Sequence, residues 1–231
     1  MGKQTDAKCI VFTGGGTAGH VTPNIALIEQ LLDEGWVVHY IGSESGMERD
    51  LIAAIDGVTY HAIATGKLRR YFSWQNFIDP FRVLKGCLQA RRLIRRIKPD
   101  VVFSKGGFVS VPVVIAAGKT PVVAHESDFS PGLSNRIACR FTDRVCVTFE
   151  DTLAHVPHQK GVFTGTPIRP ELYAGERERA LKFTGFSGEK PVLLVMGGSL
   201  GAQKLNELLR AALPKLNETY DVIHLCGRGK E

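Results

Sequence analysis

The sequence has few cysteines and no pattern that would give them a role. Five cysteines are scattered over 231 residues, and no two of them form a C-x-x-C pair. This excludes the usual spacing of zinc ligands, and the odd number argues against a disulfide framework. The cysteines therefore indicate a reducing cytoplasm, where they serve as small buried apolar side chains.

Long hydrophobic runs are also missing. The longest, from Val111 to Gly118, is far shorter than the roughly 20 residues of a membrane-spanning helix. Residues 1–8 are polar and have no signal-peptide pattern. We therefore expect any membrane contact to be peripheral.

The composition is that of a globular protein with a basic balance. Hydrophobic residues make up 44% and charged residues 23%, which is enough for a core. Lys and Arg number 29 against 23 Asp and Glu, a formal net charge of +6. This charge suits an anionic partner, whether nucleotide, nucleic acid or acidic membrane.

Strand-like and helix-like segments alternate along the chain, which predicts βαβ units and a parallel sheet. In the helix expected over 81–98, Phe81, Leu84, Leu88 and either Ile94 or Ile97 fall near one apolar face. The predicted strands are 9–13, 36–41, 58–63, 101–104, 121–125, 144–148 and 161–164, and the other predicted helices are 21–34, 47–55, 111–117 and 133–141.

The same order begins again after a turn at 165–167. A strand at 191–196 leads through a glycine turn into a helix over 203–216 and a strand over 220–226. Two strands and one helix are too few for a doubly wound domain. We therefore predict two Rossmann-like α/β domains, 1–168 and 169–231, with the second one incomplete.

A glycine-rich turn at 14–20 follows the first strand and opens the first helix. Such a turn lets the backbone approach a phosphate at a helix N-terminus. Its glycines also fit the dinucleotide-binding pattern G-x-G-x-x-G, and Glu44 is a candidate for the acidic residue of an NAD site. The turn alone therefore permits NAD binding as an alternative. His20 faces the expected ligand as a general base, a hydrogen-bonding group or a structural residue.

Other candidate residues follow later strands. Ser199, in the second glycine turn, suits either a phosphate contact or a helix cap. Arg169 suits a diphosphate clamp or an exposed position. Glu126 ends a strand at the ligand-binding edge, where it either orients a ligand or braces a loop. Gly118-Lys119-Thr120 is no P-loop, because Val113 stands where a glycine is required.

Cationic and large apolar side chains are mixed in residues 67–77, which favours a peripheral membrane patch. Stacking on single-stranded nucleic acid, or a loop folded onto the core, would use the same residues. The patch consists of Lys67, Leu68, Arg69, Arg70, Phe72, Trp74 and Phe77.

Four motifs extend along the chain: GGGTAGHVTP at 14–23, SKGGFVSVP at 104–112, HESD at 125–128 followed by PGLSN at 131–135, and GGSLGA at 197–202. Together they resemble the MurG family, bacterial glycosyltransferases that transfer N-acetylglucosamine from UDP-GlcNAc to lipid I. The resemblance implies the GT-B fold. Residues 1–168 would bind the acceptor and the membrane, and 169–231 would begin the UDP-sugar domain.

The resemblance also implies substrates and site residues. UDP-GlcNAc and lipid I (undecaprenyl-pyrophosphoryl-MurNAc-pentapeptide) would react at the cytoplasmic face of the cell membrane, against anionic lipid, in peptidoglycan synthesis. No nucleic acid, metal or cofactor is expected. His20 matches a histidine proposed for catalysis. The substrate contacts would be Thr17, Ala18, Gly19, Gly106, Gly107, Asp128 (where the family often has asparagine), Arg169 and Ser199.

The implied mechanism is a single displacement with inversion. The muramyl 4-hydroxyl attacks the anomeric carbon, His20 takes its proton, and UDP leaves with its charge stabilised by Arg169 and helix N-termini. The family's ribose and uracil contacts would lie beyond Glu231, so a chain that ends there is expected to turn over little. The alternatives are another acceptor, a UDP-sugar 2-epimerase, an NAD dehydrogenase and a non-catalytic nucleotide-binding module.

Overall fold

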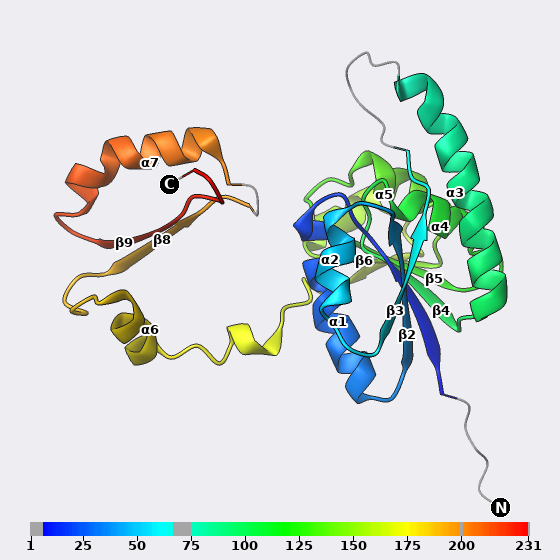
Figure 1. Cartoon of the computed structure of the whole chain (residues 1–231), viewed down its shortest axis with the longest axis horizontal. Coiled ribbons are helices and arrows are strands. Elements are labelled where there is room, and N and C mark those ends of the chain that lie inside the picture. Colours follow the sequence, from blue (N-terminus) through cyan, green and yellow to red (C-terminus); the bar gives the residue numbers. More distant parts are fainter. Residues whose placement is uncertain (1–6, 67–74, 199–200, 231) are drawn as a thin grey trace, which may run out of the picture. The chain divides into compact units, whose positions relative to one another are not determined.

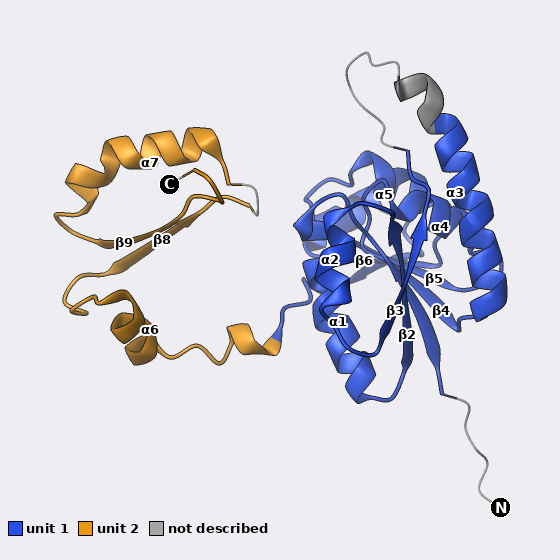
Figure 2. Ribbon diagram, viewed as in Figure 1, with its two compact units in different colours: residues 1–169 blue, residues 170–231 orange. Residues whose placement is uncertain are grey.

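The computed structural model describes residues 7–66, 75–198 and 201–230. The chain divides into two compact units, Met1–Arg169 and Pro170–Glu231 (Figure 2). The sequence places the boundary after residue 168, and the roles that it assigns to the two domains stay predictions.

The first unit is built on a seven-stranded sheet with the order β3-β2-β1-β4-β5-β6-β7, in which every neighbouring pair is parallel. The chain runs outward from β1 to β3 and then returns to the centre at β4. The order reverses between β1 and β4, where open α/β sheets bind ligands at their carboxyl ends. The strands are β1 Cys9–Thr13, β2 Val37–Ser43, β3 Val58–Ile63, β4 Val101–Ser104, β5 Val122–Glu126, β6 Arg144–Val147 and β7 Gly161–Phe163.

Helices cover both faces of this sheet (Figure 1). Successive residues of β1 point to opposite faces: Phe12 packs with Ile28 of α1 and Ile52 of α2, whereas Val11 packs with residues of α3 and α4, such as Ala90. The helices are α1 Thr22–Asp33, α2 Met47–Ala53, α3 Gln75–Ile97, α4 Ser110–Ala116 and α5 Leu133–Ala138, with short 3-10 helices at Ala18–His20 and Glu150–His155.

The apolar face predicted for α3 is wrong for its first three residues and right for Ile94, which is buried in the core. Phe81, Leu84 and Leu88 are 74%, 60% and 54% exposed, and along the same stretch the helix instead buries Gly86 and Ala90. The cause is the close approach of the helix to the sheet, because a Cβ on Gly86 would lie 2.1 Å from the carbonyl oxygen of Ala64. Small residues therefore turn inward, and an apolar stripe of large side chains stays on the surface. The helix also begins at Gln75, ahead of the predicted residue 81.

The second unit contains one parallel pair, β8 Val192–Met196 and β9 Asp221–Leu225, joined by α7 Gln203–Leu216. This is the predicted strand, glycine turn, helix and strand. The unit also has a 3-10 helix at Pro170–Leu172 and a helix α6 at Arg177–Thr184 that the sequence patterns did not reveal. Alternate residues of β8, including Leu194 and Met196, are exposed.

Candidate active site

The first glycine loop, residues 14–20, is held tightly against its surroundings. A Cβ on Gly14 would lie 2.4 Å from the carbonyl oxygen of His20, and Gly16 has a φ of +88°. The Tyr40 hydroxyl donates to the Gly14 carbonyl at 2.8 Å, and the Asn24 amide donates to the Tyr40 oxygen at 3.2 Å. These bonds fix a backbone turn that only glycine can make at Gly16.

A buried carboxylate that the sequence patterns did not identify anchors this loop from the other side. Glu48 is fully buried, and its carboxylate accepts hydrogen bonds from the Ser43 backbone at 3.1 Å, from the Ser43 hydroxyl, and from the Gly16 backbone at 3.3 Å. A buried charge is tolerated only when it is hydrogen-bonded in this way. The one signal for it is position, since Glu48 follows the carboxyl end of β2, which neighbours β1 in the sheet.

The second glycine loop, after β4, touches the first. Gly107 has a φ of +83°, and a Cβ there would lie 2.2 Å from the carbonyl oxygen of Gly15. Gly106 has a φ of +90°, and its Cβ would meet the Asn135 side chain at 2.6 Å. Both positions therefore need glycine for their conformation and for their lack of a side chain. The two loops form one continuous backbone surface.

His20 lies at the junction of the two loops. Its Nδ1 is 3.2 Å from the carbonyl oxygen of Lys105, which can only accept, so Nδ1 donates. In the neutral ring Nε2 is then the unprotonated nitrogen. Burial, and next the charge of Lys105, hold the pKa of His20 below its usual value, which favours the neutral ring. A neutral imidazole with a free Nε2 can accept a proton.

A buried lysine lies beneath this junction. Lys105 is 1% exposed, and its Nζ donates to the Ser127 hydroxyl at 2.6 Å. Burial lowers the pKa of Lys105, an effect that the nearby Glu126 and Asp128 oppose. Sequence reasoning did not single out Lys105, because a lysine between a strand and two glycines is usually exposed.

Glu126 organises the loop that follows β5. One carboxylate oxygen accepts from the Asp128 backbone at 2.9 Å, and the other accepts from the Gly132 backbone at 3.1 Å and the Asn135 amide at 2.8 Å. The side chain is buried, with both oxygens occupied. Of the two roles left open by the sequence, these contacts favour bracing the loop. Asp128 itself is exposed.

A cavity of about 680 Å³ opens beside the glycine loops. One end consists of loop backbone and His20, and the other walls are apolar side chains of α3, α4 and α5. Its lining residues are Gly15, Gly16, Thr17, His20, Gly66, Val83, Gly107, Phe108, Val111, Ile115, Leu133, Ser134 and Ile137. A ligand with a charged or polar head and an apolar tail matches this lining.

Only some of the other predicted site residues lie near the cavity. Ala18 and Gly19 lie with His20 in the 3-10 helix of the first loop. Arg169 is exposed at the end of the first unit and does not line the cavity. Ser199 and the membrane-patch residues Lys67, Leu68, Arg69, Arg70, Phe72 and Trp74 lie outside the described residues, and Phe77 is described only as part of α3.

No group of three or more His, Cys, Asp or Glu residues in the ranges 7–66, 75–198 and 201–230 could hold a metal ion. No helix in the same part of the chain is long and apolar enough to cross a membrane.

Comparison with known proteins gives close relatives. One relative, the UDP-N-acetylglucosamine--N-acetylmuramyl-(pentapeptide) pyrophosphoryl-undecaprenol N-acetylglucosamine transferase of Geobacillus thermodenitrificans, is 56% identical over 96% of this chain and 63% of its own length. The crystal structure of Acinetobacter baumannii MurG matches with a TM-score of 0.70 and 29% identity, over 96% of this chain and 59% of that one. The chain thus spans about three fifths of the proteins it matches.

Structural likeness extends to other enzymes with the same fold. A UDP-N-acetylglucosamine 2-epimerase matches with a TM-score of 0.60 at 12% identity, over 95% of this chain and 62% of its own. At that identity only the fold is shared. The predicted fold class, α/β of the GT-B type, is confirmed.

Family models match both units. Residues 10–147 match the glycosyltransferase family 28 N-terminal domain, and residues 192–231 match the glycosyltransferase family 28 C-terminal domain. The resemblance to the MurG family that the four motifs indicate is also confirmed. The chain therefore belongs to glycosyltransferase family 28.

Proposed function

We propose that the protein transfers N-acetylglucosamine from UDP-GlcNAc to the 4-hydroxyl of the muramyl sugar in lipid I, which gives lipid II for peptidoglycan synthesis. The observation that carries the proposal is the cavity of the first unit, where His20 and two glycine loops meet apolar walls. A sugar diphosphate joined to a polyprenyl chain has the same two-part chemistry. The names of relatives at 53–56% identity support the donor and the acceptor.

His20 acts as the general base in this proposal. Nε2 takes the proton of the muramyl 4-hydroxyl as its oxygen forms a bond to the anomeric carbon of GlcNAc. The bond from that carbon to the diphosphate breaks, its electron pair leaves with UDP, and the configuration inverts. The hydrogen bond from Nδ1 to the Lys105 carbonyl supports this role, because it fixes the tautomer and the ring orientation.

Backbone groups and cations stabilise the two diphosphates. Glycine loops 14–20 and 105–108 offer backbone N–H groups at close approach. Thr17, which lines the cavity, and its neighbours Ala18 and Gly19 are the proposed sugar contacts. Arg169, Ser199 and Asp128 remain proposed donor contacts by resemblance, and no cofactor takes part.

We propose further that the protein acts on the cytoplasmic face of the cell membrane, held to its anionic lipids. The apolar stripe Phe81, Leu84 and Leu88 on α3 supports this, because these large apolar side chains are exposed. The predicted patch in 67–77 directly precedes and enters the same helix. The net positive charge of the chain also favours binding to an anionic membrane surface.

The test is transfer of labelled N-acetylglucosamine to a lipid I analogue. The enzyme would be this chain continued through the rest of the C-terminal domain found in its relatives. We expect labelled lipid II, and a fall in kcat of at least about 100-fold in His20→Gln, as is typical for loss of a general base. Full activity of His20→Gln would reject the base. Epimerisation of UDP-GlcNAc without transfer would reject the acceptor and favour the 2-epimerase.

A further inference from the structure

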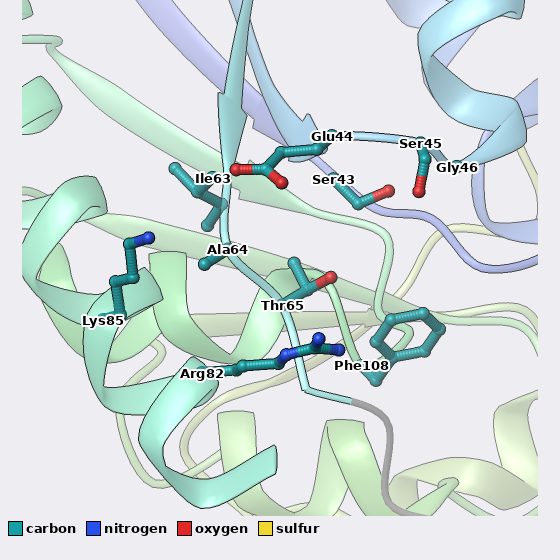
Figure 3. Close-up of a pocket in the computed structure, with 10 residues that line it drawn as sticks. All are labelled: Ser43, Glu44, Ser45, Gly46, Ile63, Ala64, Thr65, Arg82, Lys85 and Phe108. Atoms are coloured by element: carbon teal, nitrogen blue, oxygen red, sulfur yellow. The ribbon is translucent and has the colours of Figure 1, made fainter. Parts of the chain in front are cut away.

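A second cavity lies beside the first and has no role in the reaction described above. It measures about 510 Å³ and is found where β2 and β3 end and α3 passes over them (Figure 3). This size is typical of small-ligand sites, which span about 300–1,000 Å³. Its lining residues are Ser43, Glu44, Ser45, Gly46, Ile63, Ala64, Thr65, Arg82, Lys85 and Phe108.

The two cavities share a wall. The Phe108 side chain lines both, and its ring packs on the first glycine loop, since a Cβ on Gly16 would lie 2.5 Å from the Phe108 Cε1. The chain neighbours Thr65 and Gly66 line one cavity each, as do Arg82 and Val83. A branched ligand with its reactive group near His20 can therefore extend a branch past Phe108 into the second cavity.

The second cavity carries an excess of positive charge on its helix side. Arg82 and Lys85 are three residues apart on α3, so their side chains emerge on the same face. Figure 3 shows both on the helix, across the cavity from Glu44, which follows β2. Among the described residues that line the cavity, Glu44 is the one carboxylate against two cations. The Thr65 and Ser45 hydroxyls add hydrogen-bonding groups to the lining.

We propose that this second cavity binds the peptide branch of the acceptor through the carboxylates of that peptide. The inference rests on the proposed function, which supplies an N-acetylmuramyl-pentapeptide as acceptor. In a muramyl sugar the peptide is attached through the lactyl ether on C3, next to the reacting 4-hydroxyl on C4. A sugar held with its 4-hydroxyl near His20 thus has its peptide branch starting one ring atom away.

The chemistry of the lining fits such a branch. A peptide ends in a free carboxylate, which a guanidinium binds with two parallel hydrogen bonds. Lys85 supplies a second cation, and the apolar contacts of Ile63, Ala64 and Phe108 suit small aliphatic side chains. Glu44 disfavours a second anionic group on its side, so the cavity orients the branch as well as binding it.

The test measures binding of soluble acceptors to the 231-residue chain by titration calorimetry. One acceptor is a short-chain polyprenyl-pyrophosphoryl-MurNAc-pentapeptide, the second lacks the peptide and ends in a capped lactyl group, and the third has every peptide carboxylate amidated. The proteins are wild type, the double variant Arg82→Gln/Lys85→Gln, and the control Arg91→Gln/Arg92→Gln. The control removes the same charge from exposed positions of α3 that do not line the cavity.

We expect wild type to bind the pentapeptide acceptor about tenfold or more tightly than the other two, as loss of a charge-assisted contact predicts. The double variant should lose that difference and keep its affinity for the peptide-free acceptor, while the control behaves as wild type. Equal affinity of wild type for all three acceptors would overturn the subsite and leave the proposed function intact. Failure of every acceptor to bind would reject the proposed acceptor, and the subsite with it.

Two further results would also overturn the peptide subsite. A loss in the control variant equal to that in the double variant would mean a general charge effect of α3. Binding of anionic phospholipid vesicles that falls in the double variant, without any dependence on peptide, would assign Arg82 and Lys85 to the membrane surface instead.

Discussion

The contact between the two glycine loops can be tested by adding a single methyl group. In Gly107→Ala the new Cβ would lie 2.2 Å from the Gly15 carbonyl oxygen and 3.1 Å from His20 Cδ2. The backbone at Gly107 also has a φ of +83°, which other residues adopt at a cost of about 1–2 kcal/mol. The substitution therefore strains one residue and forces two loops apart.

The loss of stability in Gly107→Ala is best compared with the loss in a control variant, Gly35→Ala. Gly35 ends α1 with a φ of +81° and has nothing within 4 Å of its Cβ position, so Gly35→Ala costs only the conformational part. In Gly107→Ala, parting the loops also stretches the bond from His20 to the Lys105 carbonyl, worth about 0.5–1.5 kcal/mol. We expect losses of about 1–2 kcal/mol for Gly35→Ala and about 2–3 kcal/mol for Gly107→Ala.

Urea unfolding followed by tryptophan fluorescence measures this difference. The chain has two tryptophans, Trp36 and Trp74, and both precede residue 170, so the signal reports on the first unit. When the free energy of unfolding falls by about 2 kcal/mol per M urea, a difference in stability of about 1 kcal/mol between the two variants moves the unfolding midpoint by about 0.5 M. Equal midpoints for the two variants would refute the close contact of the loops.

Three further predictions concern ionisable side chains of the first unit that are buried or partly buried. Glu126→Gln should cost about 1–3 kcal/mol and speed proteolysis of the loop at 127–132, because one N–H group loses its acceptor; unchanged stability and proteolysis would contradict the bracing role. In an NMR titration the pKa of His20 should lie below its usual value and rise in Lys105→Met, which removes a lowering charge; a fall would reverse the assigned sign. Burial also lowers the pKa of His125, so the unfolded chain binds more protons below about pH 6.5 and stability should fall as the pH drops through that value, while a rise in melting temperature there would argue against it.

The alternation of strands and helices was predictable because each element has a local signal. Short runs of apolar residues that are soon followed by glycines, such as Val101–Phe103 ahead of Gly106, are typical of buried parallel strands. The strand order was also constrained, since parallel strands need crossover helices. The helix at Arg177–Thr184 was not predicted, because it buries no residue and therefore has no apolar face to detect.

The burial of α3 could not be predicted from periodicity. Large apolar residues at Phe81, Leu84 and Leu88 have helical spacing, yet Gly86 and Ala90 face the sheet because the backbones approach closely. The spacing of apolar residues predicts an apolar helix face, but it does not predict whether that face packs against the protein's own core or lies on the surface. The same limit applies to the cavities, whose walls come from α3, α4 and α5.

The candidate site was predicted in part. The glycine loops could be predicted because runs of glycine between a strand and a helix are recognisable in the sequence. His20 could be placed near the expected ligand because it belongs to the first of these loops. Glu48 and Lys105 gave no such signature, because their roles depend on neighbours in the sheet rather than in the chain. A charged residue becomes informative only when its burial is known, and burial is a property of the fold.

In the proposed function, the first unit by itself contains the acceptor site. The measurement that tests it most directly is an amide NMR map of the isotopically labelled 231-residue chain, titrated with the short-chain polyprenyl-pyrophosphoryl-MurNAc-pentapeptide. We predict saturable shifts at Gly15, Gly107 and Leu133, which line the first cavity, with none along β9. Shifts confined to residues 170–231, or no saturable shift at the glycine loops, would contradict the account.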